Sequence, residues 1–207
     1  MDQTDAIDAI RSALKSQYHA ALAMLRDAVQ RCPDALWTAD DHTNAIWQLA
    51  YHTLFFTHLY LQPDEAAFRP WEGHQSDVQH PDAILRRVDA TSELAPLPEP
   101  YTKDQILAYW RSCDDMVDDA VDALGLLAAE SGFHWYRMPK LDLQIVNVRH
   151  IQHHAGQLAD RLRAAADVGG EWVGARRSHR GMTIDCEAHT FPRSYGYRRC
   201  HVEAVTG

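Results

Sequence analysis

Apolar residues recur at steps of three and four in four segments of the chain, the spacing that places them on one face of an α-helix. These segments are residues 4–30, 44–61, 102–127 and 141–166. None of the remaining stretches shows a convincing strand alternation. Four amphipathic helices with no strand predict an all-α fold, and an antiparallel four-helix bundle is the arrangement that such helices favour.

Local signals predict where several of these helices begin and end. A proline at position 33 ends the first helix, because proline cannot continue the hydrogen-bond ladder. Thr43 is placed to be the N-cap of the second helix. Thr102 and Gln105 form the Thr-x-x-Gln capping box that opens the third. The apolar repeat of the third helix continues as far as Leu127.

Two stretches fall outside the helical pattern. Residues 62–101 are rich in proline and acidic residues, which predicts a long crossover between the second and third helices, with a short helix at 81–90. The pattern changes again near the C-terminal end of the chain. We therefore expect one bundle domain over residues 1–175 and a poorly ordered or irregular tail over residues 176–207.

Composition and charge exclude several classes of partner. The apolar fraction of 46% and the charged fraction of 24% are typical of a globular protein. A net charge of −9 argues against nucleic acid and against an anionic membrane surface. No stretch has the length of a membrane span or the form of a signal peptide. The four cysteines are widely spaced, which favours a reducing, cytoplasmic location.

Histidines carry the candidate chemistry, and the chain has thirteen of them. His150 and His154 are four residues apart on the predicted fourth helix, about 40° around its axis and about 6 Å along it, so both imidazoles can reach one point. His52 lies between Leu49 and Phe56 on the apolar core stripe of the second helix, and His154 lies on the core stripe of the fourth. The sequence predicts one divalent metal ion held by these three histidines, with at least one coordination position left open.

Two other interpretations of the histidines stay open. The three side chains are ordinary core residues if Asp, Tyr or backbone oxygens satisfy their nitrogens. The protein is a non-catalytic metal-binding bundle if large side chains fill the space above the ion. Further candidates beside the predicted ligands are Trp47, Tyr51, Asn147, Arg149 and Gln157.

These motifs together resemble those of DinB-like metalloproteins of the DinB/YfiT-like superfamily. The resemblance rests on the histidine within AIWQLAYHTLFF, on the helix-four motif His-x-x-x-His-x-Gly-Gln-Leu from His150 to Leu158, and on the helix order with its long crossover. It covers about residues 4–175. It implies a four-helix bundle of up-down-down-up topology with a metal on His52, His150 and His154.

The resemblance also implies a chemistry. Members of the family hold Zn²⁺ or Ni²⁺, many are homodimers, and the characterised enzymes are transferases or isomerases that use thiols of the mycothiol or bacillithiol type. We therefore expect a metal-dependent thiol S-transferase or isomerase whose partners are a small-molecule substrate, a low-molecular-weight thiol and a second copy of the chain. The alternative is a non-catalytic stress-response or dimeric scaffold protein that binds a metal.

Overall fold

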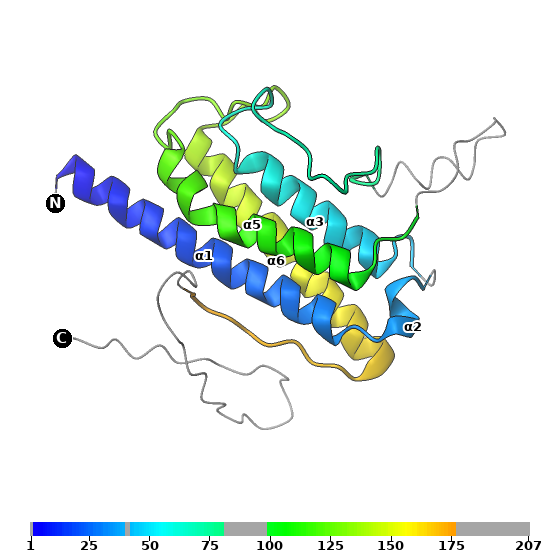
Figure 1. Ribbon diagram of the computed structural model, residues 1–207. Helices are drawn as coiled ribbons and strands as arrows, with labels where there is room; N and C mark the ends of the chain where they lie inside the picture. The colour runs from blue at the N-terminus through cyan, green and yellow to red at the C-terminus, as the bar shows by residue number, and fades with distance from the viewer. Residues whose placement is uncertain (1, 40–41, 81–98, 177–207) are drawn as a thin grey trace.

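The computed structural model describes residues 2–39, 42–80 and 99–176, which form helices and connecting loops (Figure 1). The helices are α1 (Gln3–Arg31), α2 (Asp34–Trp37), α3 (Ile46–Tyr60), α5 (Lys103–Ala123) and α6 (Lys140–Ala166). The four long helices agree with the four predicted segments, and the part of the chain that is described contains no strand. The short helix predicted at 81–90 and all but the first residue of the predicted tail lie outside the described residues.

Hydrogen bonds between helices give the direction of each neighbour. Lys15 of α1 donates to Asp122 near the end of α5, while Trp110 near the start of α5 donates to the carbonyl oxygen of Leu22. Residue numbers rise along α1 as they fall along α5, so these two helices are antiparallel. The same two helices also pack side by side along their length in Figure 1.

Helix α6 packs against α1 on one side and against α3 on the other. Gln144 near its start bonds Tyr18 in the middle of α1 and the carbonyl oxygen of Tyr60 at the end of α3. Arg161 near its end donates to the carbonyl oxygen of Asn44, just before α3. Helix α3 is therefore antiparallel to α6. Figure 1 shows that α1 and α6 run in the same direction, so α3 is also antiparallel to α1 and parallel to α5. The bundle has the expected up-down-down-up topology.

The parallel relation of α3 and α5 explains the long crossover. The chain leaves α3 at one end of the bundle and must return to the other end before α5 begins. Helix α5 has 21 residues, which corresponds to a distance of about 30 Å. A short turn cannot span that length, so the connection between residues 61 and 102 has to be long.

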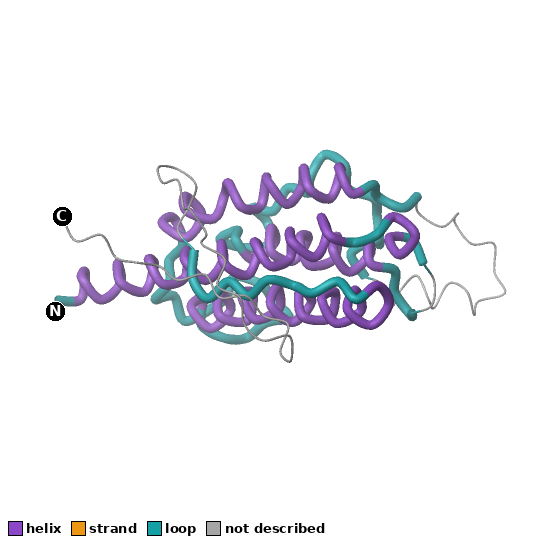
Figure 2. The backbone as a smooth tube through the Cα atoms, turned by 90° about the horizontal axis from the view of Figure 1, so that it is seen from below, coloured by secondary structure: helices purple, strands orange, loops and turns teal. Residues whose placement is uncertain are grey.

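The chain after α6 runs back along α1, which Figures 1 and 2 both show. The side chain of Gln17 donates to the carbonyl oxygen of Gly174, and the amide of Arg176 donates to that of Ser16. Nearer the end of α6, the amide of Glu171 donates to the carboxylate of Asp27. Residues 168–176 therefore cover part of α1 instead of extending from the bundle.

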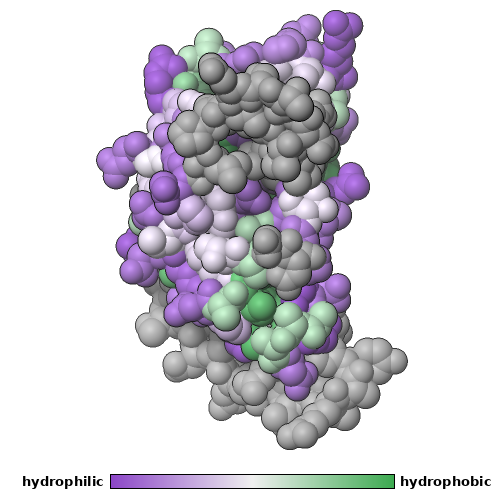
Figure 3. All heavy atoms as spheres, turned by 90° about the vertical axis from the view of Figure 1, so that its right-hand side faces the viewer, coloured by the Kyte–Doolittle hydropathy of each residue, from purple (hydrophilic) through white to green (hydrophobic). Residues whose placement is uncertain are grey.

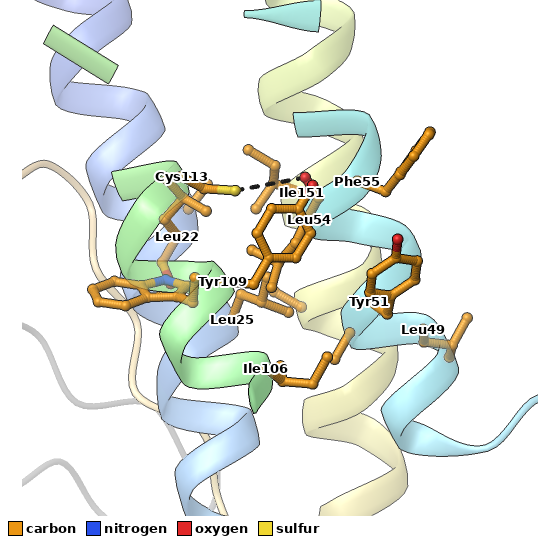
Figure 4. Close-up of a cluster of buried hydrophobic side chains, with 14 of the residues drawn as sticks. Leu22, Leu25, Leu49, Tyr51, Leu54, Phe55, Ile106, Tyr109, Cys113 and Ile151 are labelled. Atoms are coloured by element: carbon orange, nitrogen blue, oxygen red, sulfur yellow. Dashed lines mark hydrogen bonds between the residues drawn. The ribbon is translucent and has the colours of Figure 1, made fainter. Parts of the chain in front are cut away.

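The core lies between the four long helices, and all of them contribute apolar side chains to it (Figure 4). Helix α3 is buried around most of its circumference: eleven of its fifteen residues are buried. Because such a helix has no continuous polar face, its sequence does not show which side is turned toward the solvent. Cys113 of α5 lies in this core, where its thiol donates to the carbonyl oxygen of Leu54 at 3.7 Å.

Two local expectations were wrong. Thr43 is not the N-cap of α3, because Ala45 occupies that position and its amide donates to the side chain of Gln48 at 2.8 Å. The apolar repeat of α5 does not continue to Leu127, because the helix ends at Ala123 and Leu127 is 66% exposed. The capping box of Thr102 at the start of α5 is confirmed.

The hydropathy of the surface is that expected of helices whose apolar sides face inward. Many of the described side chains on the face turned to the viewer in Figure 3 are hydrophilic, and a group of hydrophobic side chains lies in its lower half. No helix among the described residues is both long enough and apolar enough to span a membrane.

A buried ion pair joins α1 to α5. His19 is 3% exposed, its Nδ1 lies 2.8 Å from a carboxylate oxygen of Asp114, and its Nε2 lies 3.1 Å from one of Asp118. Because carboxylates accept hydrogen bonds, both ring nitrogens donate and the imidazole is protonated. Burial by itself lowers the pKa of His19, but the hydrogen bonds and charges of Asp114 and Asp118 outweigh burial and raise it.

This pair predicts a pH dependence of stability. The folded state raises the pKa of His19 above the unfolded value of about 6.5, so the pair stabilises fully below that pH and less as the pH rises through the folded-state value. The double variant His19→Gln/Asp114→Asn lacks this contribution. Urea unfolding from pH 5.5 to 9 is expected to show a difference in unfolding free energy between wild type and variant that decreases with pH. A difference that is constant, or that increases, would contradict the assignment.

Candidate metal centre

Three histidines from two antiparallel helices converge between α3 and α6. His52 comes from α3, and His150 and His154 come from successive turns of α6. The Nε2 atom of His150 lies 3.0 Å from that of His52 and 3.1 Å from that of His154. One nitrogen from each ring lies within 4.8 Å of the other two, an arrangement that could hold a metal ion. The structure thus brings together the three residues predicted as ligands.

The opposite nitrogens of two rings are fixed by oxygen atoms. His52 Nδ1 lies 2.7 Å from the backbone carbonyl oxygen of Gln79, and His154 Nδ1 lies 2.7 Å from Oε1 of Gln157. Both oxygens are acceptors, so each Nδ1 carries the proton and each Nε2 presents a lone pair. Such outer hydrogen bonds set the tautomer and ring orientation of metal-binding histidines.

Burial and mutual proximity keep the imidazoles of His150 and His154 neutral. Burial, and then the nearby His154 and His52, lower the pKa of His150 to about 3. Burial, and then His52, lower the pKa of His154 to about 4, although its hydrogen bond to Gln157 acts in the opposite direction. At neutral pH no proton competes with a metal ion for these two rings.

The geometry of the three nitrogens fits a small divalent cation. Tetrahedral ligands at about 2.0–2.1 Å from Zn²⁺ are about 3.3 Å apart, close to the 3.0 and 3.1 Å separations here. The Nε2 atoms of His52 and His154 carry no proton, so neither can donate a hydrogen bond to His150. A proton on Nε2 of His150 could form a hydrogen bond with only one of these two atoms. A cation between the rings satisfies all three lone pairs. His150 Nδ1, in contrast, is buried without a hydrogen-bond partner among the described residues.

The ligand histidines do not lie on the core stripes, which is where the sequence placed His52 and His154. Both are half-buried, while the fully buried positions of α6 include Asn147, Ile151 and Ala155. The histidines occupy helix positions beside these buried ones, at the edge of the interface between α3 and α6. This position leaves them accessible from outside the bundle.

A pocket of about 410 Å³ opens beside the histidines. Its described lining consists of His52, Phe56 and Tyr60 from α3, Val146, Arg149, His150 and His153 from α6, and Tyr136 from the loop between α5 and α6. That volume suits a small organic molecule. Because aromatic and aliphatic side chains form much of the wall, the pocket can receive an apolar group next to His52 and His150.

The remaining predicted candidates divide between core and site. Trp47 and Tyr51 are buried core residues, and Tyr51 bonds His74 at 2.5 Å. Asn147 is also buried, and its amide donates to the carbonyl oxygen of Thr57. Gln157 orients His154, and Arg149 lines the pocket, as described above.

Two contributions were not predicted from the sequence. Gln79 orients His52 through its backbone carbonyl, and a backbone atom leaves no signal in residue identity. His19 pairs with Asp114 and Asp118, whose four-residue spacing on α5 was the one available hint. This ion pair lies at the α1–α5 interface, on a different pair of helices from the metal site.

Comparison with known proteins agrees with the fold. The sequence profile of the DinB superfamily matches residues 17–158, which include α3, α5, most of α6 and all three histidines of the site. Comparison with curated proteins and with solved structures gives no match. Because the profile spans more than half of the sequence, the chain belongs to the DinB superfamily.

Proposed function

We propose that His52, His150 and His154 bind one divalent metal ion, with Zn²⁺ the first candidate and Ni²⁺ the second. The observation that carries the proposal is the convergence of the three Nε2 atoms, two of them with the opposite nitrogen fixed by an oxygen. The lowered pKa values of His150 and His154 add that both rings are neutral at pH 7. Three protein ligands leave a tetrahedral ion one open position, as in catalytic sites.

We propose further that the centre serves a thiol-dependent transferase or isomerase reaction. A divalent ion at this site would lower the pKa of a thiol and favour the nucleophilic thiolate. The described cysteines are unsuited to that role: burial raises the pKa of both Cys32 and Cys113. We propose that the thiol comes from a small cosubstrate, as the family resemblance implies.

The chain's own residues have three tasks in this proposal. Gln79 and Gln157 hold two of the histidine rings with their lone pairs turned to one point. Phe56, Tyr60 and Tyr136 form an aromatic wall that orders an organic substrate and reduces its contact with water. Ser131 supports this wall, because its hydroxyl donates to the carbonyl oxygen of Tyr136 at 2.5 Å.

The pocket favours the enzyme over a non-catalytic metal-binding bundle. A purely structural site would be closed by protein ligands or by large side chains. The described residues instead leave about 410 Å³ next to His52 and His150. Association into a homodimer is a separate proposal that rests on the family resemblance.

Consumption of a model electrophile such as chlorodinitrobenzene by the zinc-loaded protein tests the enzymatic proposal across several small thiols. We expect His154→Ala to reduce the thiol-dependent rate at least about a hundredfold, because the site loses one ligand and the ring that Gln157 orients. His134→Ala, at an exposed histidine outside the pocket, is the matched control and should keep the wild-type rate. An unchanged rate in His154→Ala, or no thiol-dependent rate in the wild type, would reject catalysis and leave metal binding to be judged separately.

A further inference from the structure

The pocket beside His52 and His150 carries a positive charge, although the protein as a whole is acidic. The chain has 29 acidic and 20 basic residues, yet no acidic residue is among the described residues that line the pocket. Arg149 is the one described lining residue whose side chain is permanently charged. An anion entering the pocket therefore meets a positive charge and, among the described lining residues, no carboxylate that would repel it.

Arg149 is on the pocket side of α6. Val146, Arg149, His150 and His153 follow one another at steps of three, one and three residues and all line the pocket. Arg149 and His150 therefore border the same pocket of about 410 Å³. One small molecule can contact both.

No acidic residue lies close enough along the helix to form an ion pair with Arg149. The positions three and four residues away are Ile145, Val146, Gln152 and His153, and none of them is acidic. Arg149 is exposed, and it forms no hydrogen bond or ion pair with another described residue. Its five N–H donors are therefore available, in the planar fork that suits the two oxygens of a carboxylate.

We infer that Arg149 is a specificity-determining residue that binds the carboxylate of a small thiol whose sulfur meets the metal centre. The inference rests on the proposed metal site and adds the chemical class of the cosubstrate. The carbon chain between the two groups packs against Phe56 and Tyr60, which line the opposite wall of the pocket on α3.

The test uses the full-length protein loaded with Co²⁺, whose absorption reports thiolate ligation directly and without turnover. The probes are 3-mercaptopropionate and its neutral analogue 3-mercaptopropanamide, which differ in the carboxylate alone. In the wild type we expect the acid to bind about tenfold more tightly than the amide. In Arg149→Gln the two probes should bind equally, while the cobalt content stays at the wild-type value.

Two further variants separate recognition from general charge effects. Arg149→Lys keeps the positive charge without the planar fork and should retain part of the preference. Arg111→Gln removes the same charge from an exposed position on α5, a helix that does not pack against α6, and should keep the full preference.

The outcomes distinguish this inference from the proposal on which it depends. A full acid preference in Arg149→Gln, no preference in the wild type, or no thiolate absorption on the cobalt-loaded protein would each overturn the role of Arg149. A wild-type protein that binds no cobalt, measured before any thiol is added, would overturn the metal site itself and this inference with it.

Discussion

Replacing His150 and His154 together by alanine is expected to abolish metal binding. The double variant keeps His52 alone, and a single half-buried imidazole cannot hold a divalent ion against water. Elemental analysis of protein purified without a histidine tag should find about one equivalent of metal in the wild type and less than about a tenth of an equivalent in the variant. The variant should remain helical by circular dichroism, because both residues lie at the edge of the core.

His153→Ala is the matched control for this experiment. It removes an exposed histidine from the same helix without removing a proposed ligand, so its metal content should equal that of the wild type. Chelation of the wild-type protein should lower its melting temperature, since an ion present at a thousand times its dissociation constant stabilises the folded state by about 4 kcal/mol. Equal metal contents in wild type and double variant would place any bound ion elsewhere.

Truncating a leucine at the centre of the bundle is expected to cost more free energy than any surface change. Leu54 of α3 is 0% exposed and lies among core side chains from the neighbouring helices (Figure 4). Leu54→Ala removes buried methyl groups and leaves a cavity, so urea unfolding should show a loss of about 2–5 kcal/mol. Zinc-free protein should be used, so that metal binding does not mask the difference.

Leu127→Ala provides the same chemical change at a site that is 66% exposed. It should alter the free energy of unfolding by less than about 0.5 kcal/mol. If Leu54→Ala and Leu127→Ala cost similar amounts, the packing of α3 against its neighbours is not as the structure describes it.

Short-range features of the fold could be predicted because each depends on neighbours in the chain. The helical period, the stop at Pro33 and the capping box at Thr102 are set within one or two turns. The pair of His150 and His154 belongs to the same class, because the geometry of an α-helix alone brings residues four apart to one side. Thr43 was misassigned because the N-cap residue is Ala45, whose side chain makes no capping hydrogen bond and whose residue type therefore gives no signal in the sequence.

The burial of α3 limited what could be predicted about His52. Since this helix is apolar around most of its circumference, every position resembles a core position and the edge cannot be distinguished from the centre. The sequence therefore placed His52 on the core stripe, whereas it is half-buried beside a pocket.

The sequence by itself determined the four long helices, the need for a long crossover, and the histidine pair on α6, since helix periodicity and chain stiffness act locally. The tertiary structure decided which histidine from a distant helix meets that pair, since His52 and His150 are separated by 98 positions and become neighbours through the antiparallel packing of α3 and α6. It also decided the contact of Gln79 with His52, the ion pair of His19, and the placement of Arg149 in the pocket. These depend on the register between elements, which is set by the packing of the whole core and not by any single segment of the chain.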